Sequence, residues 1–104
     1  MTNIDEVFDT FANAQRRRLL IHMLEHNPED DTKAYIGDMD VDDGELEELL
    51  MQMTHIHLPK LEADGFINWD KEEHVVTKGP NFDEIRPLVE LLNNHEDELP
   101  NGWL

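Results

Sequence analysis

The sequence predicts a small α+β domain with about four helices and one antiparallel β-hairpin. The stretch Glu45 to Trp69 has the pattern of a helix that ends at Gly65 and continues into an extended run. Two short runs, 66–69 and 74–77, then flank a polar tip at 70–73, which is typical of a hairpin. A chain of 104 residues, 38% of them apolar, can bury one modest core, so we expect one domain.

The helix that ends at Gly65 has one face for the core and one for a partner. At about 100° per residue, its core-facing stripe contains Leu46, Leu50, Met53, His57 and Leu61. The opposite arc contains Glu48, Gln52, His55, Pro59 and Glu62. Because Pro59 removes a backbone hydrogen bond on the exposed arc, we expect the helix to bend away from the proline and keep its apolar stripe on the core.

The N-terminal segment predicts a helix in two pieces. An apolar stripe at helical spacing begins at Ile4, breaks near Asn13 and resumes at Leu20. Arg16, Arg17 and Arg18 follow the break and form the basic cluster of the chain. Their guanidinium groups suit phosphate oxygens, but 25 acidic residues compete for eight basic ones, which favours pairing within the protein.

The segment between the two long helical patterns is less regular. Residues 27–31 (NPEDD) predict a turn, and residues 32–39 predict a short strand followed by a weak helix. Residues 40–44 (DVDDG) lack the ligand order of a calcium loop, so we interpret Asp42 or Asp43 as the N-cap of the next helix.

A last helix follows the break at Gly79 and Pro80. Asn81 and Glu84 have the spacing of a capping box, although Pro87 could move the helix start to within a residue or two of itself. This helix has more apolar surface than a short helix needs to cover a small core. The apolar residues are Ile85, Leu88, Val89 and Leu92. We expect the surplus, together with Trp103 and Leu104, to form a contact between two copies.

The formal charge of −17 is the strongest compositional signal, and it has three interpretations. The acids are spread along the chain beside a good core pattern, which argues against disorder. A halophile-type surface is the first interpretation, since concentrated salt screens its self-repulsion. A surface that mimics DNA and an acidic face for one protein partner are the other two.

Histidines and other reactive groups give no predicted catalytic or metal site. His22 and His26 lie one helical turn apart, but no third ligand is evident, and His57 is interpreted as a core histidine. The sequence lacks a nucleophile elbow, a phosphate loop, an HExxH motif and cysteine, so we expect no enzyme, metal or cofactor. It also lacks an apolar run of roughly 20 residues or a basic leader, which predicts a cytoplasmic protein without membrane contact.

Two blocks of the sequence resemble a known family. His57-Leu58-Pro59-Lys60-Leu61, followed by Ala63, Gly65, Phe66 and Ile67, resembles the HLxxLxxAGL(V/I) signature of ArsR-like winged helix-turn-helix regulators. The HxHLPKL variant is similar to the archaeal, halophile-type branch, and residues 11–24 are similar to the first-helix pattern ALxxxxRxxILxxL. The resemblance implies a winged-helix domain over residues 1–104, with residues 82–104 as a possible dimerisation element. Residues 32–44 depart from the family's second helix.

The resemblance predicts a sequence-specific transcriptional regulator that binds double-stranded DNA as a homodimer. Gln52, Thr54 and His55 are the candidate contacts to base edges, and Gln52 could pair with adenine in the major groove. Lys60, Lys71, Arg16 and Arg17 are the candidate contacts to phosphates. The alternative is a winged-helix module that binds a protein partner, because the exposed arc is acidic and the hairpin tip has one lysine.

Overall fold

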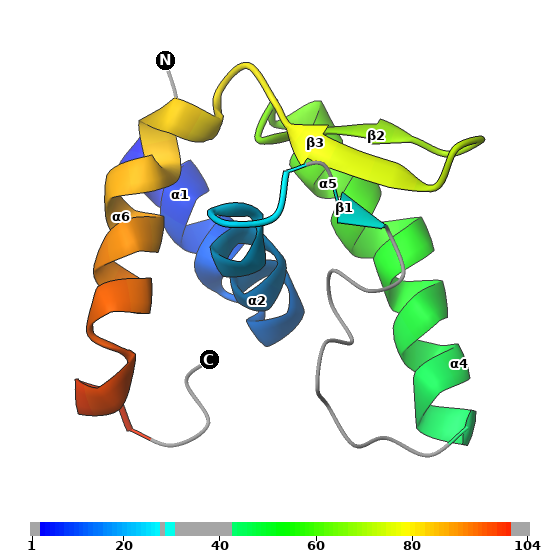
Figure 1. The fold of residues 1–104 in the computed structure, drawn as a ribbon, viewed down its shortest axis with the longest axis horizontal. Helices are drawn as coiled ribbons and strands as arrows, with labels where there is room; N and C mark the ends of the chain where they lie inside the picture. The colour runs from blue at the N-terminus through cyan, green and yellow to red at the C-terminus, as the bar shows by residue number, and fades with distance from the viewer. Residues whose placement is uncertain (1–2, 28, 31–42, 101–104) are drawn as a thin grey trace.

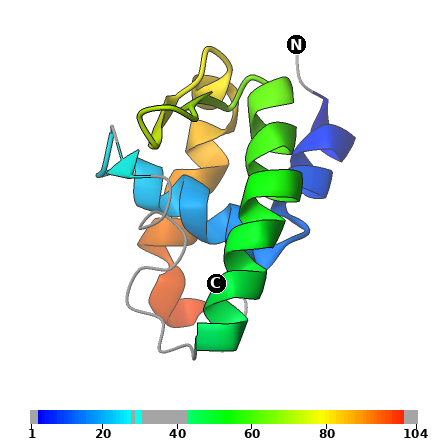
Figure 2. The same cartoon turned by 90° about the vertical axis from the view of Figure 1, so that its right-hand side faces the viewer.

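The computed structural model describes residues 3–27, 29–30 and 43–100. These residues form an α+β fold with the layout of a winged helix and its hairpin wing, which confirms the predicted fold class. Figure 1 shows the small sheet at one end of the molecule, with α2 between α6 and the helical run from α4 to α5. In Figure 2 that run faces the viewer and extends from the bottom to the top of the molecule.

The predicted break in the N-terminal helix is confirmed, and asparagines cap both pieces. Helix α1 spans Ile4–Phe11 and helix α2 spans Ala14–Met23. The Asn3 side chain accepts from the backbone N–H of Glu6 at 2.9 Å. The Asn13 side chain accepts from Gln15 at 2.9 Å and from Arg16 at 3.3 Å. Because an N-cap oxygen satisfies otherwise unpaired N–H groups, Asn13 stabilises the start of α2 directly after the short connection from α1.

One helical run contains three segments: α4 (Asp43–Gln52), the π-helical turn η1 (Met53–His57) and α5 (Leu58–Ala63). Within η1 the backbone N–H of Leu58 donates to the carbonyl of Met53, five residues earlier. The turn widens immediately before Pro59, where an α-helix would clash with the ring and lack one N–H donor. The sequence predicted a bend away from Pro59 and did not predict this wider turn.

The predicted left-handed cap at Gly65 is confirmed, with φ at +81°. The N–H of Gly65 donates to Glu62 O, and the N–H of Phe66 donates to Leu61 O, both at 3.0 Å. These two bonds form a Schellman motif, which satisfies carbonyls at the end of α5. The chain then turns directly into the sheet.

The sheet contains the predicted hairpin and one further strand. Strands β2 (Ile67–Asp70) and β3 (Val75–Lys78) are antiparallel, with Ile67 opposite Lys78 and Asp70 opposite Val75. Both strands begin one residue later than predicted: Phe66 N–H belongs to the helix cap before β2, and His74 before β3 lies in the left-handed region. The short strand β1 (Glu29–Asp30) pairs with the other side of β3, where the sequence predicted a turn. The predictions for residues 32–42 lie outside the described residues.

Helix α6 spans Phe82–Asn94 and is followed by the short 3₁₀ turn η2 at Glu96–Glu98. The prediction that Pro87 would move the helix start was wrong: the carbonyl that its missing N–H would have used belongs to exposed Asp83, where water can replace the bond. The predicted N-cap role of the Asn81 side chain was also wrong. Its Nδ2 instead donates to the carbonyl of Asp64 at 3.0 Å, which ties α6 to the end of α5.

The core is one cluster to which the helices and the sheet all contribute. Its fully buried large side chains are Phe66, Phe82, Leu19, Leu20, Met23, Met53, Leu58, Leu61, Ile67, Ile85, Val76 and Val89. Ile85 and Val89, which the sequence assigned to a surplus face, therefore serve this core. Leu88 and Leu92 pack partly against it.

Candidate nucleic-acid interface

The π-helical turn η1 presents two of the predicted DNA contacts to solvent. Thr54 and His55 are exposed, whereas Met53 and His57 on the same turn are buried. Gln52, the last residue of α4, is partly buried. The wide turn therefore divides neighbouring residues between the core and the surface. Thr54 and His55 are the more accessible of the three predicted base contacts.

A hollow of about 280 Å³ lies between η1 and the hairpin. It is lined by Thr54 and His55 from η1, Trp69 from β2, and Lys71 and His74 from the hairpin tip. The Lys71 ammonium nitrogen lies 4.9 Å from the centre of the Trp69 ring, a cation–π distance. We call these five residues the wing hollow. It brings Thr54, His55 and Lys71, predicted separately from the sequence, to one place.

Sequence reasoning missed two members of the wing hollow. A tryptophan in an amphipathic hairpin is a signal that could have identified Trp69, which is only partly buried. His74 lies in the left-handed region with φ at +58°, and it is the one described non-glycine residue there. Nothing in the sequence distinguished this histidine from other polar tip residues, because its placement depends on the turn geometry.

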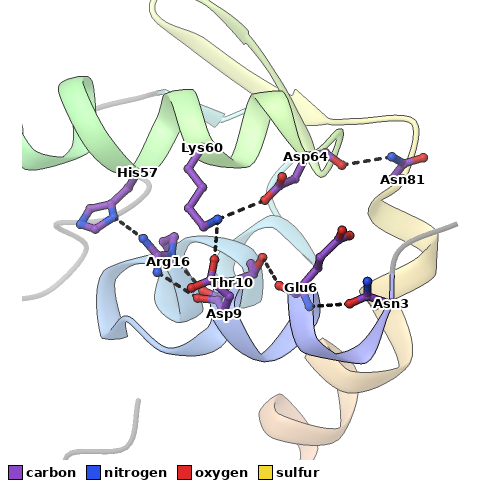
Figure 3. Close-up of polar contacts among 9 residues, drawn as sticks. All are labelled: Asn3, Glu6, Asp9, Thr10, Arg16, His57, Lys60, Asp64 and Asn81. Carbon is purple, nitrogen blue, oxygen red and sulfur yellow. Dashed lines mark hydrogen bonds and ion pairs between the residues drawn. The ribbon is translucent and has the colours of Figure 1, made fainter.

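Lys60, a predicted phosphate contact, forms ion pairs with two carboxylates of the protein. Its ammonium nitrogen lies 2.7 Å from Asp9 Oδ2 and 3.5 Å from Asp64 Oδ2 (Figure 3). The hydrogen bond with Asp9 raises the pKa of Lys60, and the same contact lowers the pKa of Asp9. Lys60 therefore joins α5 to α1, and a phosphate would have to compete with both carboxylates for it.

Arg16 and Arg17, two further predicted phosphate contacts, form hydrogen bonds within the protein. Arg16 is 8% exposed; its Nε donates to Thr10 O at 2.9 Å and its Nη2 donates to Asp9 O at 3.0 Å. Nη1 of Arg17 donates to Phe11 O at 2.6 Å. The two guanidinium groups thus donate to carbonyls in the last turn of α1, which lack the N–H donor that an α-helix supplies four residues later. Arg16 is too deeply placed to reach a phosphate in this conformation.

His57 accepts the third hydrogen bond of the buried arginine. Arg16 Nη1 lies 3.0 Å from His57 Nδ1, and His57 is 4% exposed (Figure 3). Because arginine can only donate, Nδ1 must be the unprotonated nitrogen of a neutral imidazole. Burial lowers the pKa of His57, and the positive charge of Arg16 lowers it further. The interpretation of His57 as a core histidine is confirmed.

The imidazole rings of His22 and His26 are stacked. The rings of His22 and His26 lie with their centroids 4.1 Å apart and their planes at 14°. Among the described residues, no group of three or more histidine, aspartate and glutamate side chains is placed to hold a metal ion. No helix within this part of the chain is long and apolar enough to cross a membrane.

Comparisons with models of protein families, with characterised proteins and with solved structures found no match. The function is therefore inferred from the geometry of the wing hollow, the exposed helix face and the charges around them.

Proposed function

We propose that this protein is a sequence-specific, DNA-binding transcriptional regulator of the winged-helix type, acting in the cytoplasm of a salt-rich archaeal cell. The observation that carries the proposal is the wing hollow: Thr54 and His55 on the exposed helical turn lie beside Lys71 on the hairpin. Side chains on a helix in the major groove read base edges and cations contact phosphates, and this junction offers both kinds of group.

In this proposal the run from α4 to α5 is the recognition helix. Thr54 and His55 donate to or accept from base edges, and Gln52 reaches an adenine if its partly buried side chain turns outward. Exposed Glu48, about one turn earlier, accepts from a cytosine amino group. Lys71 contacts the phosphate backbone from the wing.

Electrostatics limit how this regulator can bind. The chain carries −17 formal charges, Arg16 is buried, and Lys60 is held by two carboxylates. Counterion release therefore contributes little, and it would fade further in concentrated salt. Most of the affinity must come from base contacts and from the fit of the two surfaces, which favours specific over non-specific binding.

We also propose that the regulator is a homodimer through α1 and α6. Ile4 and Phe8 on α1 and Leu91 on α6 are each more than half exposed. Such large apolar side chains are candidates for burial between two copies. Light scattering should give twice the mass of the 12.2 kDa chain, and the double variant Phe8→Glu, Leu91→Glu should give one chain mass. A wild-type monomer at all micromolar concentrations would contradict the dimer.

A specific observation also supports a protein-binding module as a second candidate. Met51 and Ile56, on the exposed side of the same helical run, are each more than half exposed. An interface core is typically apolar, with few charges, so these two side chains suit a protein surface better than a DNA groove. In this alternative the acidic surface around them selects a basic or apolar partner.

Selection of bound duplexes from a random DNA pool in molar KCl tests the proposal. We expect a palindromic motif to be enriched by the wild type and lost by the variant Gln52→Ala, His55→Ala. The variant Glu25→Ala, exposed just after α2, serves as the control and should enrich the same motif. Absence of enrichment at every salt concentration would overturn the regulator and favour the protein-binding module.

A further inference from the structure

The wing hollow has an unusual composition for this protein. Its lining consists of one ammonium, two imidazoles, one hydroxyl and one indole, from Lys71, His55, His74, Thr54 and Trp69. None of these five described side chains is acidic, although the chain has 25 acidic residues. A concave surface with several donors and without carboxylates favours an anion.

Two acidic residues near the hollow, Asp70 and Glu62, accept hydrogen bonds from backbone N–H groups. Asp70 Oδ1 accepts from the backbone N–H of Glu73 at 3.1 Å, within the hairpin tip. Glu62 Oε2, from α5, accepts from the backbone N–H of Trp69 in β2 at 3.1 Å. These carboxylates thus have local hydrogen-bond donors, and neither lines the hollow.

The backbone at His74 supplies an independent argument. Glycine adopts the left-handed conformation at low cost, whereas a non-glycine residue there is uncommon, and His74 has φ at +58°, although histidine is enriched in this region among the non-glycine residues. His74 adopts this conformation at the end of the hairpin tip, and its side chain lines the hollow. Residues held in sparsely populated conformations cluster at ligand sites, where the geometry of the side chain matters.

We propose that the wing hollow is a binding site for a phosphate oxyanion, held by Lys71, His74 and His55 with the Thr54 hydroxyl as a further donor. The Trp69 ring forms the wall that orients Lys71. Either a phosphate of the DNA backbone or a free phosphorylated small molecule supplies this chemistry. With DNA as the source, the inference rests on the proposed function and deepens it, because the bound phosphate would fix the wing against one strand. Thr54 and His55 are then reassigned from base edges to that phosphate, which leaves Gln52 and Glu48 as the base contacts.

The test is a titration of the full chain with inorganic phosphate, at constant ionic strength set with KCl, followed by NMR. We expect saturable shifts of the Trp69 indole N–H and of the backbone amides of Thr54, Lys71 and His74. Lys71→Gln should weaken phosphate binding about tenfold or more, the loss expected for one charge-assisted hydrogen bond. Arg86→Gln, on α6, removes the same charge outside the hollow and should leave binding unchanged.

A second variant separates loss of the ligand from loss of the fold. His74→Gly removes the imidazole and suits the left-handed backbone, so the protein should unfold at the same or a higher temperature while phosphate binding weakens. Absence of saturable shifts in the wild type would overturn the inference. Equal weakening by Arg86→Gln and Lys71→Gln would do the same, because it would indicate general charge attraction.

A parallel titration with a DNA duplex distinguishes the two sources and the two proposals. The duplex is the one selected from the random pool, or an arbitrary sequence if none is selected. Phosphate that displaces the duplex, with both weakened by Lys71→Gln, supports the DNA backbone as the source. Phosphate binding without any DNA binding supports a small-molecule site and removes the regulator. DNA binding without phosphate binding keeps the regulator and overturns the oxyanion site.

Discussion

Arg16 and His57 show how one buried polar pair can join three parts of the chain. The guanidinium of Arg16 donates to carbonyls of α1 from its position on α2 and also to the ring of His57 on η1. A buried cation without such partners would be strongly destabilising. The pair therefore fixes the run from α4 to α5 against the N-terminal helices, and it holds His57 in its neutral form.

We expect a pH dependence of stability that originates at His57. Its folded-state pKa is lowered from 6.5 by burial and by Arg16, so the unfolded chain binds the proton more readily. The stabilising contribution is complete above about pH 6.5 and is lost as the pH falls below that value. His57→Asn retains an acceptor in place of Nδ1 but does not titrate. Thermal unfolding from pH 8 to pH 5 should show a smaller loss for the variant than for the wild type. Parallel curves would contradict the assignment.

Lys60 allows a second prediction, which rests on the proposed function. Asp9→Asn removes the closer of its two carboxylate partners, at 2.7 Å, and leaves Asp64 at 3.5 Å. The freed ammonium can then contact a phosphate, so DNA affinity should rise and its dependence on salt should become steeper by less than one charge. Binding of the selected duplex would be measured across KCl concentrations, with Asp83→Asn on α6 as the control. Equal gains in the two variants would indicate only the change in net charge.

The limits of sequence reasoning at this scale are visible in the same residues. The pattern identified His57 as a core histidine and Asn13 as a break, because burial periodicity and capping chemistry are local. It favoured pairing within the protein for the arginine cluster, but it could not identify the partners of Arg16, which are backbone carbonyls and His57 and not carboxylates. The direction of that side chain depends on how the turn at Asn13 sets α2 against the end of α1, which is a tertiary property.

At the scale of elements, strong local signals gave accurate predictions and weak ones did not. Gly65 marked the end of α5, because a left-handed cap is least costly for glycine. Strand β1, only Glu29–Asp30, carries no periodicity and exists through its pairing with β3. The turn η1 was also missed, since Pro59 indicates a distortion but not whether the helix bends or widens. The Thr54 and His55 side of the wing hollow depends on that turn.

The closing end of the hairpin provides a prediction about Gly79. A Cβ at this position would lie 2.7 Å from the backbone nitrogen of Ile67 and 2.8 Å from the carbonyl carbon of Phe66. Backbone atoms cannot move aside as a flexible side chain can, so Gly79→Ala should destabilise the protein by about 1–3 kcal/mol, as overpacking does. Chemical denaturation would measure the change in unfolding free energy. Glu72→Ala at the exposed tip should change it by less than about 0.5 kcal/mol. A Gly79→Ala variant as stable as this control would contradict the packing described.

At the scale of the whole molecule, charge is the dominant property. The chain has 25 acidic and eight basic residues. Arg16 is buried and Lys60 forms an ion pair, so contacts within the protein use basic groups as well. The fold class could be predicted from local patterns. The role of the net charge of −17 could not be predicted, because a halophilic surface and a partner-binding surface have the same composition. Only the response of the molecule to salt separates these interpretations.

We therefore expect stability to rise with salt. Self-repulsion at low ionic strength should destabilise the compact state, and screening should remove most of it by about 1 M, where the Debye length is roughly 3 Å. Thermal unfolding from dilute buffer to multimolar KCl should show the steepest rise at the lowest concentrations. The triple variant Glu96→Gln, Asp97→Asn, Glu98→Gln changes exposed acids in η2, so it should unfold at a higher temperature in dilute buffer and respond less to KCl. Sucrose, which favours compact states without screening charge, serves as the control and should affect wild type and variant equally. A wild-type unfolding temperature that stays flat or falls with KCl would exclude the halophilic interpretation, leaving the acidic surface to be explained by a partner.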